Sequence, residues 1–303
     1  MKILLVGLGV LGIRHLQSIS KLDVSIDVLE ISKKTIDSNI KYIDKNNIKK
    51  ISLLTDYDTV AKNYDICIIA TSSKPRLSII KDLQDRCSWN FLILEKFLFP
   101  YKEEFFVLEN LYRFDINKVF INCPRRYYSD YIKIKRSNKG QCTSIKIIGN
   151  NWGLGTNGIH FLDLHRYFTG ECIESFSAKA LKATESKRNG YSELSGEILF
   201  KSQSSELKLT CAKNNKEESF KIIINFKDRA YEINEIEGSQ SVFKDGLDSK
   251  SAFNAIYQSN LTEKYIKDLK KPYEIKLPKY KDAMKDHLVF LESIKDIEDI
   301  IIT

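Results

Sequence analysis

The sequence predicts an α/β protein with two domains, a doubly wound parallel sheet followed by an α+β domain with an open, mainly antiparallel sheet. Residues 1–122 alternate short apolar runs with segments of helical period, which is typical of a parallel sheet covered on both faces. From residue 123 the runs alternate apolar with polar positions and are joined by Gly, Asn and Ser, which is typical of a sheet with one solvated face. The 303 residues, 43% of them hydrophobic, suffice for two cores.

The first domain is expected to span residues 1–122 and the second residues 123–303. A late helix near residues 280–295 is expected to pack back on the first domain. In the first domain we expect strands at Lys2–Val6, Ser25–Glu30, Ile51–Leu54, Asp65–Ala70, Phe91–Leu94 and Val119–Asn122, and helices at Val10–Lys21, Lys74–Asp85 and Glu103–Phe114. In the second we expect strands at Gln141–Gly149, Phe176–Ala183, Gly196–Phe200, Glu206–Cys211, Phe220–Phe226 and Ala230–Asn234, and helices at Asn157–Phe168, Ala252–Leu269 and Tyr280–Ile294.

The strongest local motif is a glycine-rich turn that follows the first strand and opens the first helix. Gly7, Gly9 and Gly12 give the pattern G-x-G-x-x-G. The three glycines permit a tight turn, a close approach of the backbone to a pyrophosphate, and close packing of helix on strand. Val10 and Leu11 lie at the start of the helix, whose free N–H groups attract phosphate. In this context the motif predicts a Rossmann-type dinucleotide site.

Residues at the ends of two further strands extend this site. Glu30 closes the second strand, where an acid binds the adenosine ribose hydroxyls and favours NAD over NADP. Lys33 and Lys34 are either solvated turn residues or partners for a 2′-phosphate, so NADP stays open. Thr71 and Ser72 follow the fourth strand and are candidates for the nicotinamide side, or else cap the next helix.

Composition excludes several other classes of site. Six cysteines without C-x-x-C spacing and four histidines argue against a metal cluster or a redox motif, and the cysteines are expected to be small buried hydrophobes. The net charge of +8 comes from scattered lysines without a basic, aromatic-rich tract, so no nucleic-acid partner is expected. No apolar run approaches the ~20 residues of a membrane span and no secretory signal is evident, so we expect a cytoplasmic protein without a membrane partner.

Two further motifs accompany the glycine turn. The fifth strand ends Leu94-Glu95-Lys96, and the second domain contains the run Gly158-Ile159-His160-Phe161-Leu162-Asp163. With the glycine turn and the following Arg14-His15-Leu16, these make nearly the whole chain resemble the Gfo/Idh/MocA oxidoreductases. The resemblance implies a Rossmann domain followed by an open antiparallel sheet, and oxidation or reduction of a sugar-type alcohol with a nicotinamide cofactor.

The resemblance also implies residue roles. Lys96 matches the lysine that contacts substrate hydroxyl and cofactor, Glu95 is its partner at the cofactor edge, and His160 matches the acid/base histidine. The residue types suit this chemistry, because an imidazole takes the hydroxyl proton and an ammonium stabilises the developing alkoxide. Without the resemblance, Glu95 and Lys96 would be a solvated ion pair and His160 a core histidine. Asp163, one turn from His160, either orients its ring or bonds within the helix packing.

Two positions depart from the family pattern. Phe97 stands where the family has proline, and Thr156, beside Asn157, stands where the family often has an aspartate four residues before the histidine. A neutral group thus replaces a carboxylate. We therefore expect His160 and Lys96 to manage the proton without an anion on that side, and the substrate to carry its own negative charge.

The remaining candidates are substrate contacts. Trp152 either stacks on a sugar ring or is a structural tryptophan, and Arg125 and Arg126 either clamp a phosphate or carboxylate or are surface charges. Asn157 and Asp163 complete the predicted set.

The function expected from these features is hydride transfer between NAD(P) and a secondary alcohol or ketone of an anionic sugar derivative. Sugar phosphates, nucleotide sugars and sugar acids belong to this class, and the resemblance suggests a role in surface carbohydrate biosynthesis. Two alternatives stay open: an NAD-dependent glycosidase that oxidises its substrate transiently, and a non-catalytic nucleotide-binding or sensing protein. A homo-oligomer through the antiparallel sheet is expected.

Overall fold

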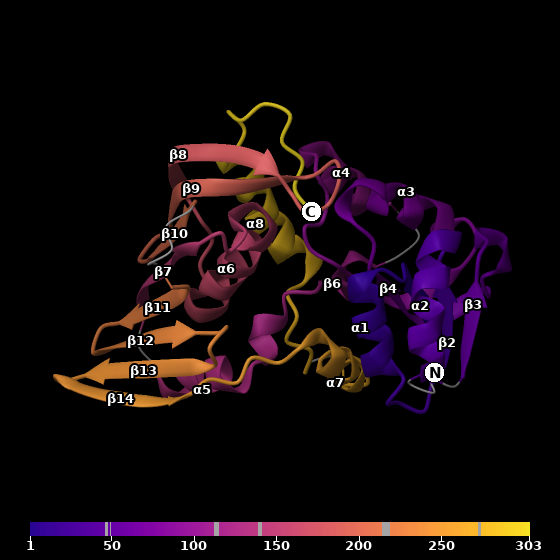
Figure 1. The fold of residues 1–303 in the computed structure, drawn as a ribbon, viewed down its shortest axis with the longest axis horizontal. Helices are drawn as coiled ribbons and strands as arrows, with labels where there is room; N and C mark the ends of the chain where they lie inside the picture. Colours follow the sequence, from indigo (N-terminus) through magenta and orange to yellow (C-terminus); the bar gives the residue numbers. More distant parts are fainter. Residues whose placement is uncertain (46–47, 49, 112–114, 139–140, 214–218, 272–273) are drawn as a thin grey trace. The chain divides into compact units, whose positions relative to one another are not determined.

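The computed structural model describes residues 1–45, 48, 50–111, 115–138, 141–213, 219–271 and 274–303. The chain forms two compact units. The first comprises Met1–Pro124 and Ile256–Asp282, and the second comprises Arg125–Ala255 and Ala283–Thr303. Figure 1 follows the chain through both units from indigo to yellow.

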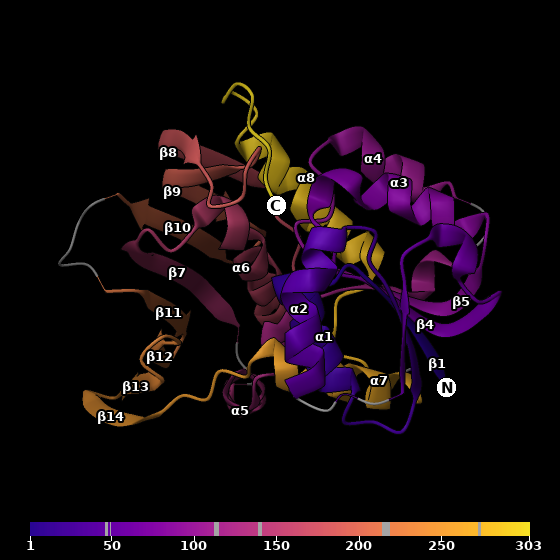
Figure 2. The same cartoon turned by 45° about the vertical axis from the view of Figure 1, so that its right-hand side comes forward.

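The first unit is built on a six-stranded sheet with the order β3-β2-β1-β4-β5-β6, in which every pair is parallel. The middle strands are buried on both faces, as expected for a sheet covered by helices. Figure 2 shows β1, β4 and β5 side by side in this sheet. The strands are β1 Lys2–Val6, β2 Ser25–Leu29, β3 Ile51–Leu54, β4 Asn63–Ile69, β5 Ser88–Leu94 and β6 Val119–Ile121, and the helices are α1 Val10–Ile19, α2 Lys33–Lys45, α3 Ser73–Gln84, α4 Lys102–Glu109 and α7 Thr262–Leu269.

The second unit is built on an eight-stranded sheet with the order β14-β13-β12-β11-β7-β10-β9-β8. Only β7 and β10 pair in parallel; the other pairs are antiparallel. Helix α6 packs on the apolar face of the sheet, and Gly158 lets it approach α8, since a Cβ there would lie 2.5 Å from the Phe290 ring. The strands are β7 Cys142–Asn150, β8 Ser175–Glu185, β9 Ser192–Lys201, β10 Glu206–Ala212, β11 Lys221–Phe226, β12 Arg229–Asn234, β13 Ser239–Lys244 and β14 Leu247–Ala252, and the helices are α5 Ser129–Ser137, α6 Leu154–Thr169 and α8 Tyr280–Ser293, which begins in the first unit.

The predicted fold class is confirmed, with local corrections. The sequence analysis did not name α2, α5, β13 or β14. The helix expected over Ala252–Leu269 is wrong in its first half, because Ala252 ends β14 and α7 begins only at Thr262. The helix expected over Glu103–Phe114 ends at Glu109 as α4, and residues 112–114 lie outside the described residues.

The division into units differs from the predicted domains in the C-terminal part of the chain. Ile256–Asp282 belongs to the first unit, where Thr262 and Tyr265 are fully buried. The late helix was expected to return to the first domain, but its residues from Ala283 onward belong to the second unit. There the Phe290 ring stacks on Phe200 of β9, with ring centroids 6.5 Å apart.

The structure also bears on the expectations from composition. The six cysteines are free, and five of them are buried, but Cys172 is exposed, which corrects the expectation for that residue. In the part of the chain that the structure describes, no group of three His, Cys, Asp or Glu side chains is placed to hold a metal ion. No helix among the described residues is long and apolar enough to cross a membrane.

Candidate functional site

The predicted dinucleotide residues lie at one edge of the parallel sheet, where the strands have their carboxyl ends. The hydrogen-bonded ladder runs one residue past each strand: the N–H of Gly7 donates to Leu29 O (2.9 Å), and that of Ala70 donates to Val6 O (2.8 Å). The strand order reverses here, because β1 is followed across the sheet by β2 on one side and by β4 on the other. Ligands of open α/β sheets bind at such a switch point.

The three glycines of the turn have different surroundings. Gly7 has a φ of +92°, which favours glycine. A Cβ on Gly12 would lie 2.0 Å from Gly7 O, so only glycine permits this helix to start so close to the strand. Gly9 is the N-cap of α1, and a Cβ there would have no atom within 4 Å. The backbone at Gly9 therefore faces open space, in which a ligand phosphate fits.

Glu30 is fixed beside the glycine turn. Its carboxylate accepts hydrogen bonds from the N–H of Leu8 and from the N–H of Ser32, each 2.8 Å long. These bonds link the end of β2 to the turn, so a half-buried acceptor stands where a ribose hydroxyl is expected. Lys33 and Lys34 are exposed in the first turn of α2.

The end of β4 carries polar groups. Thr71 Oγ1 is buried, and none of the described residues is placed to form a hydrogen bond with it. Ser72 is the N-cap of α3, but its side chain forms no capping hydrogen bond. An orphaned hydroxyl beside the open glycine turn and the anchored Glu30 fits a bound dinucleotide.

Arg76 is a structural residue of this edge that the sequence analysis missed. Its guanidinium is 1% exposed and donates to the carbonyl oxygens of Thr71, Phe97 and Leu98, the last at 2.7 Å. It therefore ties the loop after β4 to the loop after β5, which carries Lys96. A lone arginine at helical spacing in α3 gives no local signal of such a role.

The Glu95 side chain points into the first unit. It is 3% exposed, and its Oε1 lies 2.7 Å from His15 Nε2 and accepts from Asn122 Nδ2 at 2.5 Å. Burial alone would raise the pKa of Glu95, but the hydrogen bonds from His15 and Asn122 outweigh it and hold that pKa below its usual range. The His15 Nδ1 is 2.9 Å from Thr262 Oγ1 in turn. The Glu95 side chain therefore anchors the end of β5, and its place in the cofactor site stays a prediction.

Lys96 follows this anchor directly. It is half-buried, and the peptide bond to the fully buried Phe97 is cis. The N–H of Glu95 donates to Ile69 O and is the last ladder bond of β5 toward β4. Lys96 is the next residue, so it lies at the same sheet edge as the glycine turn.

In the second unit, His160 and Thr156 lie one turn apart on α6. His160 is 9% exposed. The Thr156 hydroxyl donates to Glu193 Oε2 on β9 at 2.6 Å, and Glu193 Oε1 accepts from the N–H of Gly155 at 2.6 Å. A carboxylate therefore does stand beside Thr156, supplied by a strand rather than by the helix. The expectation that this side lacks an anion is wrong.

The two predicted arginine clamps bind carboxylates of the chain itself. Arg125 pairs with Glu235 through two hydrogen bonds of 2.9 and 2.7 Å. Arg126 pairs with Asp163 at 3.0 and 2.7 Å, so the Asp163 carboxylate bonds within the packing around α6. Because both guanidinium groups are held in bidentate pairs, the structure favours a structural role for them.

Trp152 and Asn157 are held in the turn that starts α6. The indole N–H of Trp152 donates to Thr210 O at 2.8 Å, and its ring meets Phe161 edge-on with centroids 5.4 Å apart. Asn157 Nδ2 donates to Trp152 O at 2.8 Å. Both residues nevertheless line a cavity together with Thr156 and Glu193. The structure thus brings together three of the predicted residues, Trp152, Thr156 and Asn157.

No family model matches the chain, and no curated protein matches it. Solved structures do match. UDP-N-acetylglucosamine 3-dehydrogenase from Acidithiobacillus ferrooxidans is 12% identical with a TM-score of 0.72, and the match covers 98% of each chain. An oxidoreductase from Agrobacterium radiobacter, in complex with NAD⁺, L-tartaric acid and magnesium, is 13% identical with a TM-score of 0.74 over 98% of this chain and 96% of that one.

A Gfo/Idh/MocA family oxidoreductase from Vibrio cholerae is 14% identical with a TM-score of 0.70, over 98% of this chain and all of that one (100%). At these identities the similarity establishes the fold. It extends over both units, as the resemblance in the motifs implied. The chain has the two-part fold of the Gfo/Idh/MocA oxidoreductases.

Proposed function

We propose that this protein is an NAD(P)-dependent oxidoreductase that acts on a secondary alcohol or ketone of an anionic sugar derivative. The observation that carries the proposal is the glycine turn at the switch point, with open space at Gly9 and the Glu30 carboxylate fixed beside it. The similar structures support it, because one is a dehydrogenase of a nucleotide sugar and another holds NAD⁺.

The chain's own groups have distinct roles in this proposal. The N–H groups at the start of α1, at Val10 and Leu11, bind the pyrophosphate, and Glu30 accepts from the ribose hydroxyls. The bound dinucleotide gives Thr71 Oγ1 a hydrogen-bond partner, which none of the described residues provides. The nicotinamide ring, when bound, supplies or accepts the hydride. NAD is favoured over NADP, because Glu30 would repel a 2′-phosphate.

Lys96 and His160 carry the proton chemistry in the proposal. His160 accepts the hydroxyl proton during oxidation and returns it during reduction. The Lys96 ammonium stabilises the negative charge that develops on the substrate oxygen. Arg76 and Glu95 act as positioning residues, because they hold the loop that carries Lys96.

Binding of NADH to the Gly9→Val variant tests the proposal. A Cβ at Gly9 has no protein atom within 4 Å, so the variant is expected to fold as the wild type does and to lose NADH binding through collision with the pyrophosphate. Isothermal calorimetry measures the affinity, and the thermal midpoint checks the fold. Equal affinity of both proteins for NADH would refute the dinucleotide site.

The same calorimetry with Glu30→Gln decides the cofactor preference. Removal of the charge is expected to bring NADPH affinity closer to NADH affinity, while Lys33→Gln, an exposed neighbour, leaves the preference for NADH unchanged. Tighter binding of NADPH than NADH by the wild type would show that the lysines override Glu30.

The predicted homo-oligomer stays part of the proposal. The sheet face opposite α6 carries half-buried residues that mix apolar Ile148 and Ile223 with Lys146 and Lys208. Sedimentation velocity of the wild type at several concentrations measures whether this face pairs, and an Ile223→Lys variant is expected to shift the population toward monomer.

A further inference from the structure

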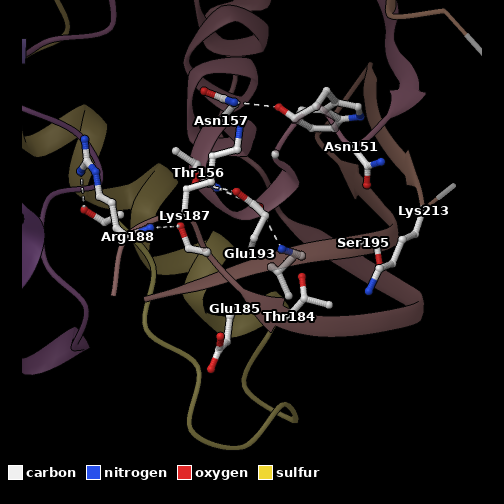
Figure 3. Close-up of a pocket in the computed structure, with 15 residues that line it drawn as sticks. Asn151, Thr156, Asn157, Thr184, Glu185, Lys187, Arg188, Glu193, Ser195 and Lys213 are labelled. Carbon is white, nitrogen blue, oxygen red and sulfur yellow. Dashed lines mark hydrogen bonds between the residues drawn. The ribbon is translucent and has the colours of Figure 1, made fainter. Parts of the chain in front are cut away.

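The second unit contains a cavity at the start of α6. Its volume is about 620 Å³, and its wall is formed by the turn before α6, the facing ends of β8 and β9, and the end of β10 (Figure 3). Polar side chains dominate the lining, with Trp152 as its aromatic member. This volume accommodates a small polar ligand.

Glu193 is the best-fixed polar group in the wall. Its Oε1 accepts three N–H groups, from Gly155 (2.6 Å), Thr156 (3.3 Å) and its neighbour Leu194 (2.8 Å). Its Oε2 accepts the Thr156 hydroxyl at 2.6 Å, and Figure 3 shows the carboxylate turned toward Thr156. The side chain is therefore held in one orientation by four hydrogen bonds.

Two glycines make the room that this carboxylate occupies. A Cβ on Gly155 would lie 2.9 Å from Glu193 Oε1, and a Cβ on Gly153 would lie 3.1 Å from Oε2. Gly153 also has a φ of +81°, which favours glycine. The two glycines at the start of α6 thus leave space for the carboxylate of Glu193, which lies on strand β9.

The hydrogen-bond count determines what the wall offers a ligand. Oε1 of Glu193 receives three donors and Oε2 receives one among the described residues, so Oε2 is the oxygen with acceptor capacity left for a ligand. Thr156 gives its single hydroxyl hydrogen to Glu193, so toward any further partner its oxygen is an acceptor. The start of α6 therefore presents acceptors, which select a ligand that donates, such as the hydroxyl groups of a sugar.

Other parts of the wall carry positive charge. Lys187, Arg188 and Lys213 line the same cavity, and Arg188 donates one of its N–H groups to Thr303 Oγ1 at 3.1 Å. Arginine has five such donors, so it can bind a further acceptor. Three cations near a hydroxyl-selecting wall favour a ligand that combines hydroxyl groups with an anionic group.

We propose that this cavity is the subsite for the hydroxyl-bearing part of an anionic sugar derivative, with Glu193 as its recognition residue. The proposal rests on the proposed function, since it names the part of the second unit that receives that enzyme's substrate. It assigns Glu193 a role that the sequence motifs do not contain.

The indole N–H of Trp152 provides a local readout. The chain has two tryptophans, and a Trp89→Phe variant assigns their two indole signals in a ¹H–¹⁵N correlation spectrum. The NADH-loaded protein is titrated to millimolar concentration with UDP-N-acetylglucosamine, UDP-glucuronate and glucose 6-phosphate. At least one probe is expected to shift the Trp152 signal saturably and to leave the Trp89 signal in place.

Glu193→Gln is the critical variant, because it keeps the size of the side chain and replaces an acceptor with a donor. Loss of a hydrogen bond to a charged group is expected to weaken probe binding by about tenfold or more. Glu185→Gln is the matched control: it removes the same charge from the same cavity wall and is expected to change the affinity by less than about twofold. Thr156→Val provides a second test if Glu193→Gln does not fold, with the same direction expected.

The outcomes separate the two proposals. Absence of NADH binding by the wild type would refute the proposed function. NADH binding without a Trp152 shift from any probe would overturn the cavity as a subsite, and equal losses in Glu193→Gln and Glu185→Gln would overturn the recognition role of Glu193.

Discussion

His165 makes the stability of the second unit depend on pH. Its side chain is 1% exposed on α6, and its Nε2 lies 2.8 Å from Ser205 Oγ. Burial lowers the pKa of His165 from 6.5 to about 4, because a buried imidazolium loses its hydration; nearby Glu171 opposes the shift only in part. In the unfolded chain the same imidazole has its ordinary pKa of about 6.5.

The sign and size of the effect follow from these two values. As the pH falls below 6.5, the unfolded chain binds a proton at His165 and the folded chain does not until about pH 4. Each pH unit in this window lowers the free energy of unfolding by about 1.4 kcal/mol. Protonation of His165 in the unfolded chain therefore lowers the free energy of unfolding by about 3 kcal/mol between pH 6.5 and 4. Above pH 6.5 this loss is absent and the stability is at its full value.

Urea unfolding at a series of pH values measures this loss. In a Trp89→Phe background, the fluorescence of Trp152 reports on the second unit. The His165→Gln variant keeps a polar group that can reach Ser205 but does not titrate, so its free energy of unfolding is expected to fall by about 3 kcal/mol less than that of the background protein over the same window. The titration of carboxylates affects both proteins and cancels in the difference.

Ser205→Ala is the matched control, because it removes the partner hydroxyl and leaves the imidazole buried. It is expected to lower stability by about 1 kcal/mol at neutral pH and to keep the pH slope of the background protein between pH 6.5 and 4. Parallel slopes for His165→Gln and the background protein would refute the reasoning, since they would mean that the folded state binds the proton as readily as the unfolded chain does.

Three further variants test other parts of the structure. Lys96→Met is expected to lower kcat by ~100- to 1000-fold with NADH affinity within a few-fold of wild type; unchanged turnover would remove Lys96 from the reaction. Asp286→Asn leaves buried Arg166 without its carboxylate partner and is expected to cost ~3–5 kcal/mol in urea unfolding, and a loss below ~1 kcal/mol would contradict a buried ion pair. Thr156→Asp places a second carboxylate against Glu193 and is expected to lower the thermal midpoint, with Glu193→Gln restoring it in the double variant; a midpoint unchanged by Thr156→Asp would argue against their contact.

The elements that the sequence predicted well are those whose signal is local. The bounds of β1 and β3 agree with the expected Lys2–Val6 and Ile51–Leu54, because continuous apolar runs end at polar turns. Every residue of β14 is exposed, so its sequence shows no alternation of apolar and polar residues. Its pairing with β13 is seen only in the folded structure. The helix expected from Ala252 starts too early for a related reason, because Ala252 pairs with Ser239 of β13 and the helix begins only at Thr262.

The residues of the candidate site also differ in whether a local sequence signal predicts them. The glycine turn and Glu30 were predictable because the fingerprint is short and each glycine has a local steric reason. The partner of Thr156 was not, because Glu193 is 37 residues away in sequence and reaches α6 only through the pairing of β9 with β10. In the folded second unit, the carboxylate beside Thr156 is supplied by strand β9 and not by α6. The chemistry available at the start of α6 is therefore set by sheet register as much as by the motif.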